Sequence, residues 1–145
     1  GEQNLFRQAL TFGGHPVCAA SALANIEIIE SEKLVNNSAR TGLYLLNKLK
    51  ELQEKHPIIG DVRGLGLLLG LELVKNRDTK ENFTPESGMS NRLNQEFRSN
   101  GLILFATDKG VSLSPPLCIN PSEVDVIIEG IHKSLSNVEK EFSIV

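Results

Sequence analysis

Residues 11–16, Thr-Phe-Gly-Gly-His-Pro, place a hydroxyl and two glycines directly before an expected helix that begins at Pro16. Backbone amides and the positive end of a helix dipole favour an anion such as phosphate at such a position. The same residues also suit a simple loop that leads into a helix. From the residues alone the loop is the better interpretation, and the anion site is the alternative.

A second glycine-rich segment, residues 64–70, could be compared with a dinucleotide-binding loop. Such a loop follows a strand and opens a helix, so that the phosphates meet the helix N-terminus. Here the glycines lead into a leucine-rich strand, and the third glycine, Gly70, is displaced by one position. We therefore expect these glycines to allow close packing around a strand.

Metal ligands and catalytic triads find little support in the sequence. His15, His56 and His132 are not paired at ligand spacing on one helix, so no metal site is predicted. A nucleophile-elbow sequence is also absent, and we expect each histidine to be structural or exposed. Cys18 and Cys118 are too few and too far apart for a disulfide framework, which favours reduced thiols in a cytoplasmic protein.

Composition argues against two classes of partner. Hydrophobic residues make up 40% of the 145 residues and charged residues 23%, which is typical of a globular protein with a core of its own. A net charge of -3 gives no sign of the basic face that binds nucleic acid. No apolar run approaches the roughly 18 residues of a membrane span, and the first residues lack the pattern of a signal peptide. We expect neither nucleic acid nor a membrane as a partner.

Periodicity and capping residues predict the elements that position these segments. Helices are expected over residues 16–31, 32–55, 85–100 and 121–142, and strands over residues 58–74, 102–105 and 111–113. The last helix has the clearest start, with Asn120 as its cap, Pro121 at its first position and Glu123 placed for a capping box. The fold class is therefore α/β (α+β), with helices packed on a small, mainly antiparallel sheet.

Two helices carry informative apolar patterns. The first, residues 16–31, is apolar nearly all round, so we expect it to pack against another domain or subunit. In the second helix the apolar stripe is expected at Val35, Ala39, Gly42, Leu46, Leu49 and Leu52.

Three motifs are familiar in combination. Residues 11–16 read TFGGHP, residues 61–67 and 70–74 read DVRGLGL and GLELV, and residues 114–117 read SPPL before Glu123-Val124-Asp125. In this order and spacing they resemble the signature of class III (omega-amino-acid) aminotransferases, which depend on pyridoxal phosphate. The resemblance spans nearly the whole chain, from Thr11 to about Leu135.

The resemblance implies a fold-type I enzyme that is a homodimer with active sites at the subunit interface. Residues 1–15 would be a remnant of the cofactor-domain loop, and residues 16–145 the small C-terminal domain. In the family, the motif threonine and the residue before it contact the phosphate of the partner subunit's cofactor. Carried over, this role falls on Thr11 and the backbone of Leu10.

The family's Schiff-base lysine and other cofactor ligands lie upstream of the threonine motif. No match to them occurs in this chain, so no catalytic residue is assigned. A Schiff-base lysine needs a depressed pKa and an adjacent electron sink, and the lysines present fit helix faces and loops better. We therefore expect the isolated chain to be inactive, as one part of a larger enzyme.

The chain departs from the family where substrate carboxylates are commonly held. Ser112 and Phe105 occupy two positions at which many members carry an arginine, and a phenyl ring cannot form the bidentate pair that guanidinium makes with carboxylate. Either a residue outside this chain holds the keto acid, or the loop from Phe105 to Val111 is rearranged. Phe105 could line an apolar pocket for an amine, or it could be a core aromatic. Arg63 is expected to form a structural salt bridge.

These observations predict an enzyme that moves an amino group from an amine or omega-amino acid to a keto acid through pyridoxal 5'-phosphate. Two alternatives stay open at this point. One is a related aminomutase that uses the same cofactor. The other is a stand-alone α/β module that works through binding or self-association, without catalysis.

Overall fold

The computed structural model describes residues 10–144, so most of the predicted remnant at residues 1–15 lies outside the described residues. The chain forms two compact units, one ending at Leu34 and the other beginning at Val35. The predicted division after residue 15 follows from motifs, not from compactness, and stays a prediction. No helix in the described part of the chain is long and apolar enough to cross a membrane.

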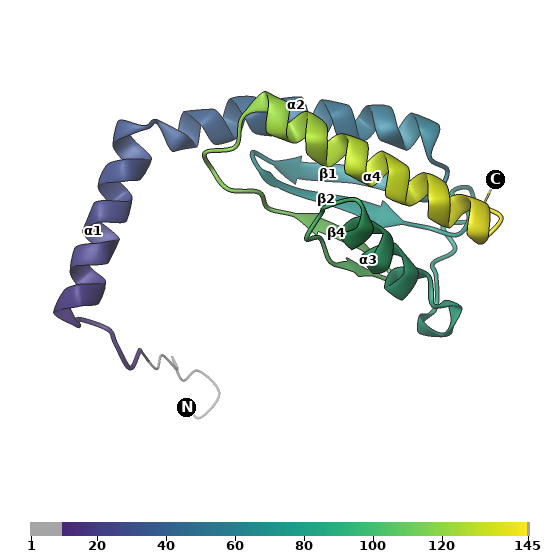
Figure 1. The fold of residues 1–145 in the computed structure, drawn as a ribbon, viewed down its shortest axis with the longest axis horizontal. Coiled ribbons are helices and arrows are strands. Elements are labelled where there is room, and N and C mark those ends of the chain that lie inside the picture. The colour runs from purple at the N-terminus through teal and green to yellow at the C-terminus, as the bar shows by residue number, and fades with distance from the viewer. Residues whose placement is uncertain (1–9, 145) are drawn as a thin grey trace, which may run out of the picture. The chain divides into compact units, whose positions relative to one another are not determined.

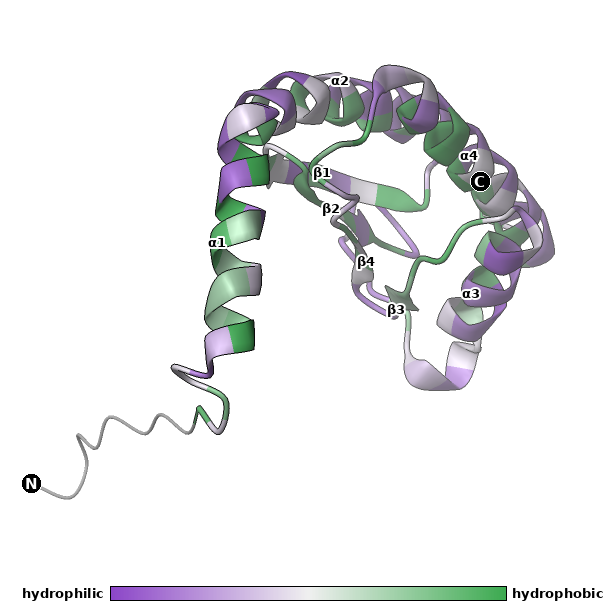
Figure 2. Ribbon diagram, turned by 60° about the vertical axis from the view of Figure 1, so that its left-hand side comes forward, coloured by the Kyte–Doolittle hydropathy of each residue, from purple (hydrophilic) through white to green (hydrophobic). Residues whose placement is uncertain are grey.

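The first unit contains helix α1 (Pro16–Ser31), with the bounds that the sequence predicts. His15 caps it, because its side chain accepts a hydrogen bond from the amide of Val17 at 3.3 Å. The helix ends before Lys33, whose φ of 54° lies in the left-handed region. None of the described α1 residues is buried, and Figure 2 shows apolar colour on successive turns. Its predicted packing against another domain or subunit stays a prediction.

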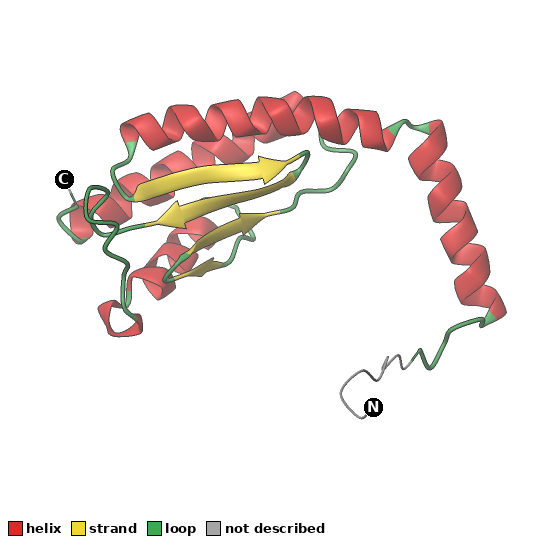
Figure 3. Cartoon of the chain, turned by 180° about the vertical axis from the view of Figure 1, so that it is seen from behind, coloured by secondary structure: helices red, strands yellow, loops and turns green. Residues whose placement is uncertain are grey.

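The second unit contains almost all of helix α2 and the remaining elements, which lie in two layers. In chain order these are α2 (Leu34–Lys55), β1 (Ile59–Leu65), β2 (Leu68–Leu73), the 3-10 turn η1 (Pro85–Ser87), α3 (Met89–Ser99), β3 (Ala106–Thr107), β4 (Gly110–Leu113) and α4 (Pro121–Glu141). The strands form one antiparallel sheet in the order β1-β2-β4-β3. Its inner face packs on helices, which lie in front of it in Figure 1 and behind it in Figure 3. The predicted fold class is confirmed.

The strand expected over residues 58–74 is a hairpin of β1 and β2. Gly66 lies between the two strands with φ of 57°, a left-handed conformation that suits glycine at a tight turn. The continuous leucine pattern conceals this turn, because Leu67 beside it is itself buried. The expectation of one continuous strand was therefore wrong, although its outer limits were nearly right.

The strand expected over residues 102–105 is absent from the described structure, and β3 begins only at Ala106. The amide of Leu102 donates to the carbonyl of Phe97 at 2.8 Å, so this residue closes the end of α3 and pairs with no strand. The third predicted helix is also shorter than expected. Gly88, at φ of 71°, separates η1 from α3.

The core lies between the inner face of the sheet and the helices α2, α3 and α4. On α2 the buried residues are Thr41, Gly42, Leu45, Leu49 and Leu52. The predicted stripe is thus right at its C-terminal end and wrong at Val35 and Ala39, which are exposed. The start of α4 is as predicted, since Asn120 and Glu123 form the two reciprocal bonds of a capping box.

A buried polar cluster joins the end of α2, the start of the sheet and α4. His56, 2% exposed, lies with its Nδ1 2.6 Å from Oε2 of Glu139 and its Nε2 2.7 Å from Nδ1 of His132. The amide of Ile58 donates to the other oxygen of Glu139 at 3.2 Å. These histidines therefore have structural roles, as His15 does in capping α1. Within residues 10–144 no three potential ligands are grouped to hold a metal ion.

Candidate functional site

The threonine motif forms a compact turn ahead of α1. The amide of Gly13 donates to the carbonyl of Leu10 at 3.1 Å, and the amide of His15 donates to the carbonyl of Phe12 at 3.1 Å. Gly14 has φ of 82°, which allows the chain to reverse before the helix. Leu10 and Thr11 are exposed, and among residues 10–144 the Thr11 hydroxyl has no hydrogen-bond partner. A ligand that approaches this turn can therefore reach both residues.

The group that the turn offers to a phosphate is the Thr11 hydroxyl, since the amides of Gly13, His15 and Val17 already donate to atoms of the turn. A hydrogen bond from the Leu10 backbone to an anion would have to come from its amide, because a carbonyl oxygen can only accept. The first turn of α1 offers an anion fewer free amides than the sequence suggests, because the Val17 amide already donates to the His15 ring. The helix carries no acidic residue in its first turn that would repel an anion.

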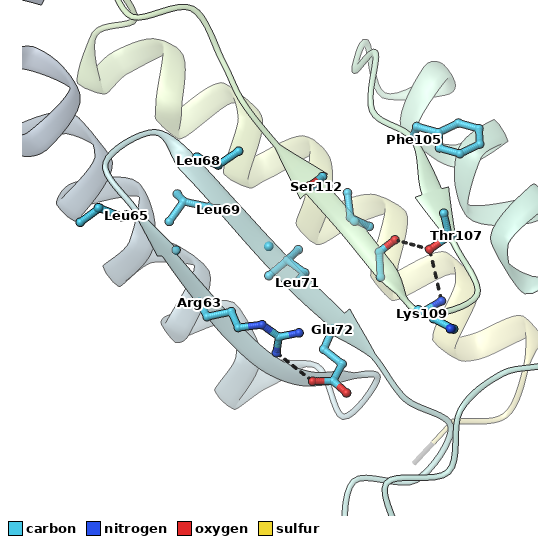
Figure 4. Close-up of a pocket in the computed structure, with 14 residues that line it drawn as sticks. Arg63, Leu65, Leu68, Leu69, Leu71, Glu72, Phe105, Thr107, Lys109 and Ser112 are labelled. Atoms are coloured by element: carbon cyan, nitrogen blue, oxygen red, sulfur yellow. Dashed lines mark hydrogen bonds and ion pairs between the residues drawn. The ribbon is translucent and has the colours of Figure 1, made fainter. Parts of the chain in front are cut away.

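The outer face of the sheet carries a shallow cavity of about 780 Å³ (Figure 4). Arg63, Gly70 and Ser112 are direct cross-strand neighbours in its floor. Phe105 stands at its β3 edge, directly before Ala106. Because glycine and serine are small, the floor is hollow between the guanidinium of Arg63 and the phenyl ring.

Phe105 is 71% exposed and precedes β3, so the interpretation of this residue as a core aromatic was wrong. It lines the sheet cavity and also a second cavity of about 420 Å³, whose lining includes residues 101–105 and 112–116. Its ring is therefore available to an apolar group. Ser112, the other position where the family often has arginine, is also exposed, on the cavity floor.

Arg63 forms the structural salt bridge that the sequence predicts. Its Nη1 lies 2.6 Å from Oδ2 of Asp61. The same atom lies 3.0 Å from Oε2 of Glu72 on the outer face of the sheet (Figure 4). The hydrogen bond from Arg63 holds the pKa of the Asp61 carboxyl below its ordinary value, and the hydrogen bond to Asp61 raises the pKa of Arg63. Two carboxylates thus already neutralise this guanidinium, which leaves it a poor ligand for a substrate carboxylate.

One residue near Phe105 carries no signal in the sequence. Asn94, in the middle of α3, forms two hydrogen bonds with the backbone of Ala106. Its spacing from Ala106 matches no motif, and only the packing of α3 beside β3 brings the two residues together.

Comparisons with known proteins agree on one family. A family model described as Aminotransferase class-III matches residues 2–135. Taurine–pyruvate aminotransferase of Bilophila wadsworthia is 40% identical over 96% of this chain and 32% of its own length. Putrescine–pyruvate aminotransferase of Pseudomonas aeruginosa is 41% identical over 90% of this chain and 28% of its own.

The fold of this chain is also similar to that of solved transaminase structures. The structure of an amine transaminase from an uncultivated Pseudomonas species, in its PLP-bound form, is similar with a TM-score of 0.85 and 31% identity. The similar region covers 95% of this chain and 31% of the amine transaminase chain. The chain therefore spans about a third of the length of these proteins.

Proposed function

Because its family model matches residues 2–135, the chain belongs to the class III aminotransferases, and we propose that it works as the C-terminal part of such an enzyme. The proposed reaction moves an amino group from an amine or omega-amino acid to a keto acid, with pyridoxal 5'-phosphate as cofactor. The observation that carries the proposal is the exposed Thr11 turn, which offers a hydroxyl to a phosphate while its neighbouring carbonyls are already bonded.

The cofactor, when bound, supplies an electron sink for the substrate carbon next to the amino group. In this proposal the Thr11 hydroxyl donates a hydrogen bond to a phosphate oxygen, and the Leu10 amide donates a second. His15 keeps the turn in place because it holds the start of α1 through the Val17 amide. The phosphate belongs to the cofactor of the partner subunit.

The Schiff-base lysine of the proposed enzyme comes from outside this chain. Among the described lysines, Lys48, Lys75 and Lys133 form ion pairs with Glu51, Glu81 and Glu129. The Glu51 carboxylate raises the pKa of Lys48, which is opposite to what imine chemistry requires. The isolated chain is accordingly proposed to be inactive.

For the substrate, we propose an amine with an apolar carbon skeleton and a small keto acid. Phe105 gives the amine an exposed phenyl surface, and Arg63, neutralised by two carboxylates, offers no anchor for a second carboxylate. The carboxylate of the keto acid is held by a residue outside this chain. Pyruvate is the acceptor named for both aminotransferases compared above, which supports it as the acceptor here.

A homodimer is proposed because α1 carries apolar residues on several sides, and none of those described is buried within the chain. Burying such a surface against a second subunit stabilises it through the hydrophobic effect. The two cysteines, Cys18 and Cys118, are free thiols, which supports the proposed cytoplasmic location.

The experiment that tests this function is Thr11→Ala in the complete enzyme, with cofactor affinity measured by absorbance titration. A hydrogen bond to a charged group contributes about 1.5–3 kcal/mol, so the dissociation constant for pyridoxal phosphate should rise about tenfold or more. Thr79→Ala, at an exposed loop threonine, is the matched control and should leave the affinity unchanged. Equal affinity for the Thr11→Ala enzyme and the wild type would remove the assignment.

A further inference from the structure

Strand β3 lies at the edge of the sheet, and among the described strands it pairs with β4 alone. It pairs with β4 through Ala106↔Val111 and Thr107↔Gly110. Ala106 is 2% exposed, so its backbone groups are shielded from water and need partners within the protein. On the side away from β4, these partners cannot come from another strand of the sheet.

The side-chain amide of Asn94 takes the place of the missing strand. Its Nδ2 donates to the carbonyl of Ala106 at 2.9 Å, and the Ala106 amide donates to its Oδ1 at 2.7 Å. One planar group thus bonds both backbone atoms of a single residue, as a neighbouring strand does in a ladder. The two bonds fix the position and the orientation of this peptide segment relative to α3.

Helix α3 is a firm support for this contact. Leu93, directly before Asn94, and Phe97, three residues after it, are fully buried. Glu96, two residues after Asn94 in the same helix, accepts a hydrogen bond from Asn137 of α4 at 2.7 Å. Asn94 therefore ties the edge strand to a helix that is itself held in the core.

Phe105 directly precedes the anchored residue and is largely exposed. Because its ring lies in two open cavities and not in the core, packing around the side chain does little to fix it. Phe105 shares a peptide bond with Ala106, so the two hydrogen bonds to Ala106 restrict the backbone from which the ring projects. On the other side of Ala106, the Thr107 hydroxyl donates to the Gly110 carbonyl at 3.1 Å and holds the turn.

We propose that Asn94 is a positioning residue that directs Phe105 toward the carbon skeleton of the amine and thereby gives the enzyme a preference for amines that carry an aromatic ring. This inference rests on the proposed function. Asn94 does not touch the substrate, and its effect passes through two hydrogen bonds and one peptide unit.

The first measurement concerns the contact itself and needs no activity. Hydrogen exchange of the Ala106 amide is followed in the 145-residue chain and in its Asn94→Ala and Asn91→Ala variants. Asn91 is an exposed residue of the same helix, so both substitutions change helix propensity equally. Exchange at Ala106 should become at least tenfold faster in Asn94→Ala alone. Equal protection in all three proteins would overturn the inference.

The second measurement separates positioning from general stability. In the complete enzyme with pyruvate, kcat/KM is measured for 1-phenylethylamine and for 2-aminobutane, and their ratio gives the aryl preference. An aromatic contact is worth about 0.5–1.5 kcal/mol, so Asn94→Ala and Phe105→Ala should each lower this ratio about two- to tenfold. The double variant should lower it no further, because both substitutions remove the same contact.

Each other result has a defined meaning. Equal losses for both amines, or losses that multiply in the double variant, would show a merely structural role and overturn the inference while the proposed function stands. A wild-type enzyme that binds pyridoxal phosphate but transfers no amino group from either amine would overturn the proposed function, and with it this inference. Asn91→Ala should keep the wild-type ratio.

Discussion

Gly42 of α2 packs directly against the turn of the β1–β2 hairpin. A Cβ atom built at this position would lie within the van der Waals radius of the Gly66 carbonyl and 2.7 Å from the Gly66 Cα. The obstacle is backbone, so no side chain can rotate away. The hairpin is also tied to the helix here, because the amide of Leu67 donates to the Ser38 hydroxyl at 3.2 Å.

Gly42→Ala should therefore reverse the usual sign of a glycine substitution in a helix. Replacing a helical glycine with alanine ordinarily stabilises by about 1 kcal/mol. Forcing α2 and the hairpin apart costs about 1–3 kcal/mol as overpacking, and the weakened bond from Leu67 to Ser38 adds about 1 kcal/mol. The net expectation is a loss of about 2 kcal/mol in the free energy of unfolding.

Urea unfolding of the 145-residue chain, followed by circular dichroism at the helix band, measures this loss. With a slope of about 2 kcal/mol per molar urea, the midpoint should fall by about 1 M. Asn47→Ala, at an exposed position of the same helix, is the control and should raise the midpoint slightly. A Gly42→Ala midpoint equal to or above that of the wild type would refute the close packing of α2 on the hairpin.

Three further substitutions test the fold. Asn120→Ala removes the capping box of α4 and should lower the free energy of unfolding by about 1 kcal/mol, measured by urea titration. Glu139→Leu leaves the buried ring of His56 without its carboxylate partner and should cost about 3 kcal/mol in the same titration; an unchanged midpoint would contradict a buried cluster. A hydrogen bond from Asn137 lowers the pKa of the Glu96 carboxyl below its ordinary value of 4.5. The ionised Glu96 carboxylate therefore contributes its full stabilisation above pH 4.5. This stabilisation is lost as the pH falls through the pKa that Glu96 has in the folded protein. The difference in urea midpoint between wild type and Glu96→Gln should shrink from pH 6 to pH 3, and a constant difference would contradict the assignment.

Local signals in the sequence predicted where α1 and α4 begin. Pro16 and the Asn120 capping box define helix starts through residues within one turn, so no distant contact is needed to find them. The hairpin turn at Gly66 was missed because leucines continue on both sides of it. Glycine spacing alone does not distinguish a turn from close packing within a strand.

Only those residues of the candidate site that belong to the sequence motifs, or align beside them, could be predicted. The motif comparison selected Thr11 and Phe105, but whether Phe105 is buried depends on how the segment before β3 leaves α3. That path is set by the contact between Asn94 and Ala106, which joins two elements through side chain and backbone. The same holds for His56 and Glu139, which lie far apart in the sequence and meet only when α4 packs on the end of α2. Neither contact leaves a periodic pattern.

The strand order β1-β2-β4-β3 has a consequence for how the domain assembles. The β1–β2 hairpin joins neighbouring residues and closes a very short loop, whereas the pairing of Leu71 with Val111 encloses the whole of α3. Closing the larger loop costs more chain entropy and slows the search for the correct register. The β1–β2 hairpin with α2 is thus able to form early, and the β3–β4 pair, whose own loop is also short, joins β2 later. During synthesis, β2 can pair with β4 only after residues 110–113, which follow α3 in the chain, have left the ribosome.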